Sequence, residues 1–118
     1  MSSRKWQQRV IDILSAISSI QKLTADVTFE GFIAKKTTVK AVLYDFIVIG
    51  EAAKSIPTQV QERYPEIPWL PMGDLRNIVA HEYFRIDLEI VWDSIQNDLE
   101  PLATQLQSLL ECETKQED

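Results

Sequence analysis

Residues 74–83, DLRNIVAHEY, bring together four polar side chains that could do chemistry. Arg76 supplies a cation, Asn77 an amide, His81 the only imidazole of the chain and Tyr83 a phenol. An imidazole can take the proton from a ribose 2′-hydroxyl, and a guanidinium can hold a phosphate as negative charge builds on it. An amide such as Asn77 can hydrogen-bond that phosphate or orient its neighbours. The set therefore suits RNA cleavage without a metal ion, with His81 as the general base.

Each of these side chains also has a structural explanation. A lone histidine near a helix end often caps carbonyl groups. Arg76 could pair with Asp74 or Glu82, and Tyr83 could be half-buried in a core. On residue types alone these structural roles are favoured, because short motifs recur by chance. A metal site is poorly supported, since one histidine with scattered carboxylates has no ligand spacing, and the chain has no nucleophile turn of a Ser/His/Asp hydrolase.

The spacing of the motif poses a geometric problem. Arg76 and His81 are five residues apart, so their directions on an ideal helix differ by about 140°. Asn77 and His81, four apart, share a face, as do Arg76 and Tyr83, seven apart. Arg76 and His81 can therefore converge only if the helix loosens near His81 or if two chains contribute to one site.

Helical periodicity dominates the rest of the chain. Long helices are expected over about 3–23, over about 38–55 with Thr37 or Thr38 as cap, and from the cap Asp87 onward. Thr28 and Thr58 should each cap a short helix. A further helix is expected over about 72–83, with Leu75, Ile78 and Val79 as its core face. Residues 41–53 are apolar on nearly every side, as in the central helix of a bundle or a helix shared with a partner. No strand-like alternation is present, so the sequence predicts an all-α bundle of four or five helices.

Glycine, proline and the polar tail add four local expectations. Gly50 costs its helix about 1 kcal/mol against alanine, which indicates a close crossing of two helices. Pro65, Pro68 and Pro71 predict a rigid extended connector, pinned to the core by Trp69. Pro101 should kink the last helix or divide it in two. The polar tail at about 111–118 is expected to fray.

Composition limits the class of protein. The 118 residues suffice for one domain, spanning 1–118. No apolar run approaches the ~20 residues of a membrane span, and the start lacks a signal peptide, so a cytoplasmic location and no membrane partner are expected. The single Cys112 can form neither an internal disulfide nor a metal cluster, and no cofactor is expected.

A net charge of −6 argues against a protein that coats nucleic acid, and no DNA partner is expected. Residues 1–40 are nonetheless basic, with seven Lys/Arg against three Asp/Glu, and could face RNA or an acidic second copy.

The octet RNIVAHEY at 76–83 resembles the Arg-x-x-x-x-His-x-Tyr motif of the HepT-like toxins, a branch of the HEPN superfamily. IGEAAK at 49–54, IPW at 67–69 and VW at 91–92 stand in the same order as in that family. Together these matches cover most of residues 5–110. The resemblance implies an up-and-down, HEPN-like bundle of four or five helices that forms homodimers, with two copies of the motif facing each other across a cleft.

The resemblance also implies a function. Members of that family are metal-independent RNA endonucleases whose motif arginine and histidine are catalytic, which are Arg76 and His81 here, with Asn77 in support. They pair with an MNT-type nucleotidyltransferase antitoxin, which transfers AMP from ATP to the motif tyrosine, Tyr83 here. A dimer would let Arg76 of one chain approach His81 of the other.

Two other interpretations stay open. In one, the bundle is a non-catalytic module that docks a nucleotidyltransferase and binds nucleotide or RNA in its cleft. In the other, it is a purely structural helical dimer, in which Arg76, His81 and Tyr83 are freely replaceable. An RNA cleavage assay in EDTA separates the first of these from an RNA endonuclease.

Overall fold

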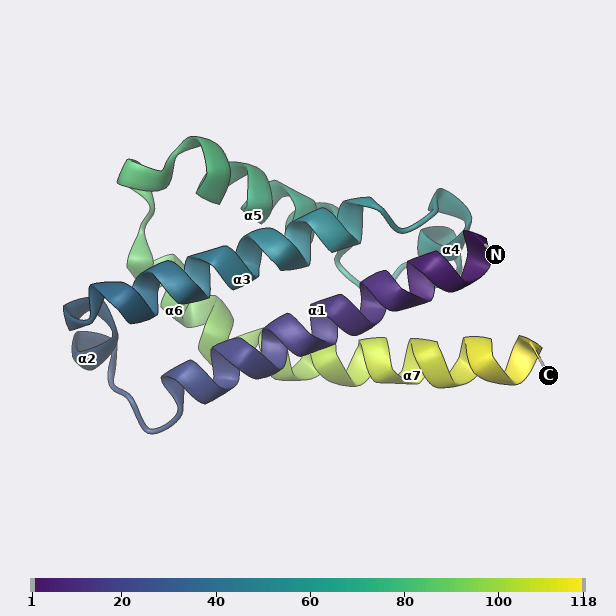
Figure 1. The fold of residues 1–118 in the computed structure, drawn as a ribbon, viewed down its shortest axis with the longest axis horizontal. Coiled ribbons are helices and arrows are strands. Elements are labelled where there is room, and N and C mark those ends of the chain that lie inside the picture. The colour runs from purple at the N-terminus through teal and green to yellow at the C-terminus, as the bar shows by residue number, and fades with distance from the viewer. Residues whose placement is uncertain (1, 118) are drawn as a thin grey trace.

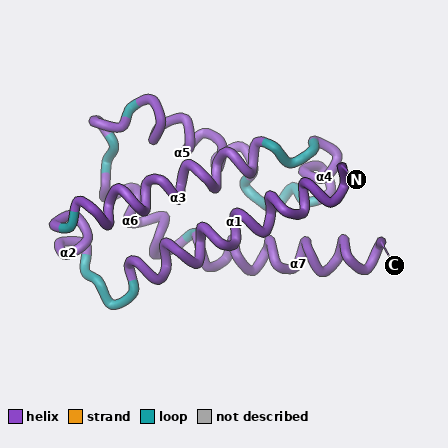
Figure 2. Tube along the Cα trace, viewed as in Figure 1, coloured by secondary structure: helices purple, strands orange, loops and turns teal. Residues whose placement is uncertain are grey.

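The structure, a computed structural model, describes residues 2–117 and the side chains of residues 5–115. The elements in chain order are α1 (Ser2–Thr24), α2 (Phe29–Ala34), α3 (Lys36–Lys54), α4 (Thr58–Arg63), α5 (Trp69–His81), the 3-10 turn η1 (Tyr83–Arg85), α6 (Leu88–Asn97) and α7 (Leu99–Glu117). Figure 2 shows helices joined by short loops, with no strand among residues 2–117. The all-α prediction is confirmed. None of the described helices is long and apolar enough to cross a membrane.

The long helices form an up-and-down bundle around α3. Helices α1 and α3 run antiparallel and pack together, α5 lies on the other side of α3, and α7 runs back along α1 (Figure 1). The shorter α6 packs against α2 and α7. Helix α3 is therefore the central element, and it holds α5, the helix of the DLRNIVAHEY motif, against the bundle.

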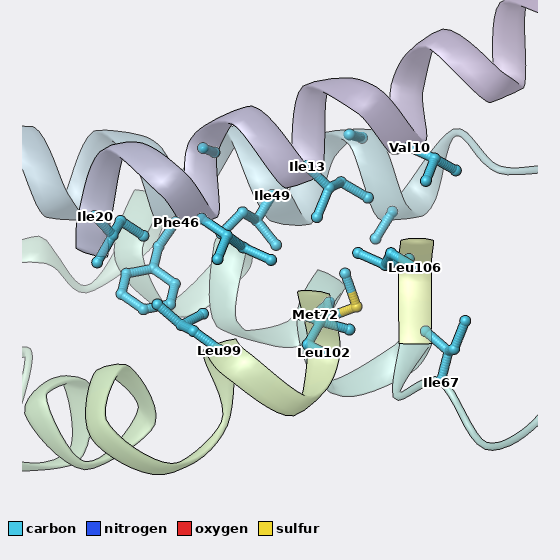
Figure 3. Close-up of a cluster of buried hydrophobic side chains, with 14 of the residues drawn as sticks. Val10, Ile13, Ile20, Phe46, Ile49, Ile67, Met72, Leu99, Leu102 and Leu106 are labelled. Atoms are coloured by element: carbon cyan, nitrogen blue, oxygen red, sulfur yellow. The ribbon is translucent and has the colours of Figure 1, made fainter. Parts of the chain in front are cut away.

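The core lies between α1, α3, α5 and α7. Figure 3 shows side chains of all four helices meeting, among them Val10, Ile13, Ile20, Phe46, Ile49, Met72, Leu99, Leu102 and Leu106. The apolar residues of α1 follow the predicted three- and four-residue spacing, so they line one stripe that the other helices cover. Each large side chain buried in this way contributes about 1.5–3 kcal/mol to folding. This core fixes the positions of α3 and α5.

Two of the predicted caps are confirmed. The Thr28 hydroxyl accepts a hydrogen bond from the Gly31 amide at 3.0 Å and begins α2. The Asp87 carboxylate accepts one from the Glu89 amide at 2.9 Å and begins α6. Each bond satisfies a backbone donor that the first turn of a helix leaves without a partner.

The other predicted caps are wrong. Helix α3 begins at Lys36, so Thr37 and Thr38 lie inside its first turn, and its N-cap Lys35 makes no side-chain cap bond. Thr58 is the first residue of α4, which follows the N-cap Pro57. The threonines mark both helix starts to within two residues, but each of them already lies inside its helix and is not its N-cap.

The predicted effects of proline hold in part. The last helix is divided, because α6 ends at Asn97 and α7 begins at Leu99 with Pro101 in its first turn, where a missing N–H is tolerated. The extended connector is shorter than predicted, since α5 already begins at Trp69 and includes Pro71. Trp69 does pin the connector: its ring N–H donates to the Tyr64 carbonyl at 3.0 Å.

The predicted fraying of the polar tail is wrong for the described residues. Helix α7 continues to Glu117, and Glu113 is buried in it. The Glu113 carboxylate accepts hydrogen bonds from Arg63 Nη2 and from the Tyr64 hydroxyl, both at 2.7 Å. Burial disfavours ionisation of Glu113, but the bonds from Tyr64 and Arg63 outweigh it and hold the pKa of Glu113 below its ordinary value. Burial and the neighbouring Cys112 and Glu113 raise the pKa of Tyr64.

Candidate active site

Helix α5 ends at His81, in the middle of the motif. The backbone leaves the helical region at Glu82 (φ −125°, ψ 37°), and residues Tyr83–Arg85 form the turn η1. The predicted helix over 72–83 is therefore shifted toward the N-terminus. The predicted alignment of Arg76 with Tyr83 is wrong, because the two no longer belong to one continuous helix. The helix ends only after His81, so Arg76 and His81 both lie in α5, and this end does not bring the two side chains together.

The Arg76 guanidinium is held at the crossing of α3 and α5. Its Nη2 lies 3.1 Å from Glu51 Oε1, and its Nη1 donates to Asn77 Oδ1 at 3.2 Å. The side chain is only 24% exposed, and its buried Nε has no hydrogen-bond partner. The ion pair joins Arg76 to α3 and not to Asp74 or Glu82, with either of which the sequence alone would allow it to pair.

Gly50 makes this crossing possible. A Cβ at residue 50 would collide with Arg76 Cβ and lie 2.8 Å from the Met72 carbonyl oxygen. The close crossing predicted from Gly50 is confirmed, and its place is the base of the Arg76 side chain. Glycine thus allows α5 to approach α3 closely enough for Arg76 to reach Glu51.

Asn77 joins a second cation to the site. Its Oδ1 accepts a hydrogen bond from Lys54 Nζ at 3.3 Å as well as the one from Arg76. Glu51 and Lys54 both belong to IGEAAK, so this segment lies directly against the motif. Sequence reasoning did not assign either residue to the site. The available signal was a pair of charges three residues apart at the end of an otherwise apolar helix.

His81 and Tyr83 lie on the surface at the end of α5. Both side chains are exposed, Tyr83 to 41%. Tyr83 packs edge-on against Phe84, with ring centroids 5.5 Å apart. Residues 81–85 line a shallow hollow of about 210 Å³. Within the described chain no hydrogen bond joins His81 to Arg76, and five helical residues separate the two by about 7.5 Å along the axis.

Apolar side chains are exposed around His81. Phe84 is 97% exposed and Ile78 46%. The prediction that Ile78 belongs to the core face is therefore wrong: Val79 is buried and Leu75 is partly buried against the core, but Ile78 lies at the exposed edge of that face. On α3, Tyr44 is 65% exposed, so the 41–53 segment is covered mainly on its sides facing α1 and α5.

The described residues contain no group of three or more His, Cys, Asp or Glu side chains placed to hold a metal ion. The side chains gathered at the site are a partly buried guanidinium, an amide, a second cation and an exposed imidazole.

The Ribonuclease HepT-like family model matches residues 13–109. The chain belongs to the HepT-like ribonuclease family. The resemblance found in the sequence is thereby confirmed, and the Arg-x-x-x-x-His-x-Tyr motif of this HepT-like chain is the segment that spans the end of α5 and η1.

The alignments with three relatives cover most of the HepT-like chain. It is 36% identical over 106 residues to the "Probable ribonuclease HepT" of Thermococcus cleftensis, covering 90% of this chain and 96% of the relative. Two proteins of Methanocaldococcus jannaschii, named as candidate RNases, are 43% identical over 86 residues (73% and 71% of the two chains) and 32% identical over 107 residues (91% and 98%). No solved structure matches.

Proposed function

We propose that this HepT-like chain is a metal-independent RNA endonuclease and the toxin of a toxin–antitoxin pair, with Arg76 and His81 as its catalytic residues. The observation that carries the proposal is the state of Arg76, which Glu51 and Asn77 hold at the α3–α5 crossing while its side chain keeps partial access to solvent. A guanidinium held in this way needs little reorganisation to stabilise charge on a phosphate. His81 lies exposed at the end of the same helix.

In the proposed reaction, His81 takes the proton of a ribose 2′-hydroxyl as the general base. The 2′-oxygen forms a bond to the adjacent phosphorus, and the bond from phosphorus to the 5′-oxygen breaks. The leaving oxygen takes a proton from the imidazolium or from water. Arg76 offsets the negative charge that develops on the phosphoryl oxygens, with Asn77 as its supporting partner.

We further propose that the complete site is formed by two copies of the chain. Arg76 and His81 of one chain lie on different sides of α5, so a two-fold contact at this surface would bring Arg76 of one copy toward His81 of the other. Two exposed apolar side chains support the contact, because Ile78 and Phe84 both lie within three residues of His81 and face solvent. Such a surface is typical of a protein interface.

Tyr83 is the proposed site of neutralisation. Its hydroxyl would attack the α-phosphorus of ATP on an MNT-type nucleotidyltransferase antitoxin, forming an O–P bond, releasing pyrophosphate and losing its proton to a base on that enzyme. The exposure of Tyr83 supports this role. AMP on Tyr83 would place a bulky anion two residues from His81 and repel RNA.

Cleavage of RNA by purified protein in EDTA tests the proposal. We expect His81→Ala and Arg76→Ala each to lower cleavage by at least about 100-fold, with helix content preserved. Lys115→Ala is the control, because Lys115 is an exposed cation of α7 outside the basic segment 1–40. Wild-type cleavage in both motif variants would contradict the proposal.

The second candidate is a non-catalytic module that docks a nucleotidyltransferase. The net charge of −6 and the acidic residues Asp74, Glu82 and Asp87 near the motif favour it, because they weaken attraction of RNA. Absence of cleavage together with measurable nucleotide binding would decide for this module.

A further inference from the structure

Lys54 lies beside Arg76 at the end of α3. Both cations donate to the same oxygen, Asn77 Oδ1, from 3.3 Å for Lys54 Nζ and 3.2 Å for Arg76 Nη1. Lys54 Nζ and Arg76 Nη1 therefore lie within hydrogen-bonding distance of one and the same atom, which places the two cations close together. Nothing in the family match or in the proposed reaction gives Lys54 a role.

The charges of this cluster do not balance. Glu51 pairs with Arg76, whereas Lys54 has no ion pair among the described residues. Asn77 is neutral, so Glu51, Lys54 and Arg76 together carry one net positive charge. Two neighbouring cations repel each other, and only one of them has an ion pair, so an anion bound between them would lower this repulsion.

Gly73 gives Lys54 room to reach Asn77. A Cβ at residue 73 would lie 3.0 Å from Lys54 Cγ and 3.4 Å from Lys54 Cδ. The missing side chain therefore lets the Lys54 stem lie along α5. Gly50 of α3 leaves space for the base of Arg76, and Gly73 of α5 leaves space for the stem of Lys54. Each cation therefore packs against a glycine of the opposing helix.

The Lys54 end of the cluster opens into a hollow of about 220 Å³. Lys54 and Asn77 line it, together with Trp69, Gly73 and the carboxylate of Asp74. Asp74 is the one acidic residue that lines this hollow, and it lowers the affinity of the hollow for anions.

We propose that Lys54, held beside Arg76 by Asn77, binds a second phosphate of the RNA backbone, next to the one that is cleaved. This role rests on the proposed function, since it takes RNA as the ligand. Lys54 contacts no reacting atom and is a binding residue. It sets the register of the strand, because one phosphate on Arg76 and its neighbour on Lys54 define the direction in which the RNA crosses α5.

Binding of a 2′-O-methyl oligoribonucleotide tests this role, because the modified strand lacks the attacking hydroxyl and stays intact. The dissociation constant is measured at several salt concentrations for the wild type and for Lys54→Gln, Lys54→Arg and Lys115→Gln. Lys115 is the matched control, an exposed lysine of α7 outside the basic segment 1–40. Loss of one phosphate contact on a single strand reduces the slope of log Kd against log salt by about 0.7.

We expect Lys54→Gln to reduce that slope by this amount and to weaken binding several-fold, Lys54→Arg to keep most of the affinity, and Lys115→Gln to match the wild type. Asp74→Asn should tighten binding. An unchanged slope in Lys54→Gln, with binding intact, overturns the role of Lys54 but leaves the proposed ribonuclease standing. That activity is judged separately, by cleavage of unmodified RNA, and absence of all RNA binding would overturn both.

Discussion

Gly50 and Arg76 touch across the α3–α5 crossing so closely that no side chain fits at residue 50. The contact lies at the base of Arg76, whose guanidinium reaches back to Glu51, the next residue of α3. A backbone position on one helix therefore determines where the guanidinium of the other helix can lie. The residues that place Arg76 are as important to the proposed chemistry as Arg76 itself.

Gly50→Ala should force α5 away from α3. The added methyl group overpacks the crossing at a cost of about 1–3 kcal/mol, partly offset by the better helix propensity of alanine, about 1 kcal/mol. We expect a net loss of about 0–2 kcal/mol in the free energy of unfolding, measured by urea denaturation, together with loss of RNA cleavage. Gly31→Ala is the control, because its nearest contact would be Thr28 Oγ1 at 3.3 Å. A Gly50→Ala protein that is stable and fully active would contradict the close crossing.

Glu51→Gln should impair the positioning of Arg76 while leaving the stability of the fold nearly unchanged. The ion pair is largely open to solvent, with the Glu51 side chain 53% exposed, so it contributes less than about 1 kcal/mol to folding. We expect unfolding to change little and kcat for RNA cleavage to fall about tenfold, because Arg76 loses its orienting partner. KM should not rise, since a negative charge near the RNA is removed. A lower KM with unchanged kcat would mean that Glu51 only repels RNA and does not position Arg76.

Mixed dimers test whether two chains form one site. Arg76→Ala and His81→Ala proteins, each inactive alone, are unfolded together and refolded as a mixture. If Arg76 of one copy works with His81 of the other, each mixed dimer keeps one of two sites, and the mixture recovers about a quarter of the wild-type activity. If both residues act within one chain, no mixed dimer has an intact site. An inactive mixture that contains dimers by light scattering would therefore exclude the two-chain site.

Tyr83→Phe should abolish modification but keep cleavage. The change removes only the hydroxyl group, so the nucleotidyltransferase has no acceptor there. We expect the wild-type protein made with its antitoxin to gain the mass of one or more AMP units, and Tyr83→Phe to gain none, by intact-mass spectrometry. Tyr44→Phe is the control, because Tyr44 is also an exposed tyrosine, on α3. AMP addition to the Tyr83→Phe protein would place the modification elsewhere.

Glu113 should make the free energy of unfolding depend on pH in the acidic range. Its pKa in the folded protein is lowered from the ordinary value of 4.5, chiefly by hydrogen bonds from Tyr64 and Arg63 that outweigh the effect of burial. The unfolded chain then takes up the proton first, so the contribution of Glu113 is present above pH 4.5 and is lost as the pH falls below that value. We expect Glu113→Gln to lose about 1–2 kcal/mol at neutral pH, because its bonds no longer involve a charged group.

Urea unfolding at pH 7 and in steps below pH 4.5 measures this effect. The difference between wild type and Glu113→Gln should shrink as the pH falls. Glu111→Gln is the matched control, because Glu111 is an exposed glutamate of the same helix. A difference that stays constant with pH would show that ionised Glu113 does not stabilise the fold.

The sequence alone determined the local features of this protein. Apolar residues three and four apart predicted the helices, Thr28 and Asp87 predicted two caps, and Pro101 predicted the division of the last helix. Gly50 even indicated a contact between helices, since a glycine in a helix is costly unless another backbone lies close. These features depend on residues within about one or two helical turns of each other, which is the range over which side-chain spacing and backbone geometry act.

Only the tertiary structure decided which distant groups meet. Arg76 pairs with Glu51, 25 residues away, and the tail residue Glu113 is buried against Arg63, 50 residues away. Spacing could not predict either pair, because both depend on the register at which whole helices pack, and that register is decided by the fit of the entire core. The same packing put Lys54 beside Arg76. Five residues of sequence separate Arg76 from His81, yet one chain leaves them apart, because both belong to α5. A regular helix turns their directions about 140° apart and separates them by about 7.5 Å along its axis.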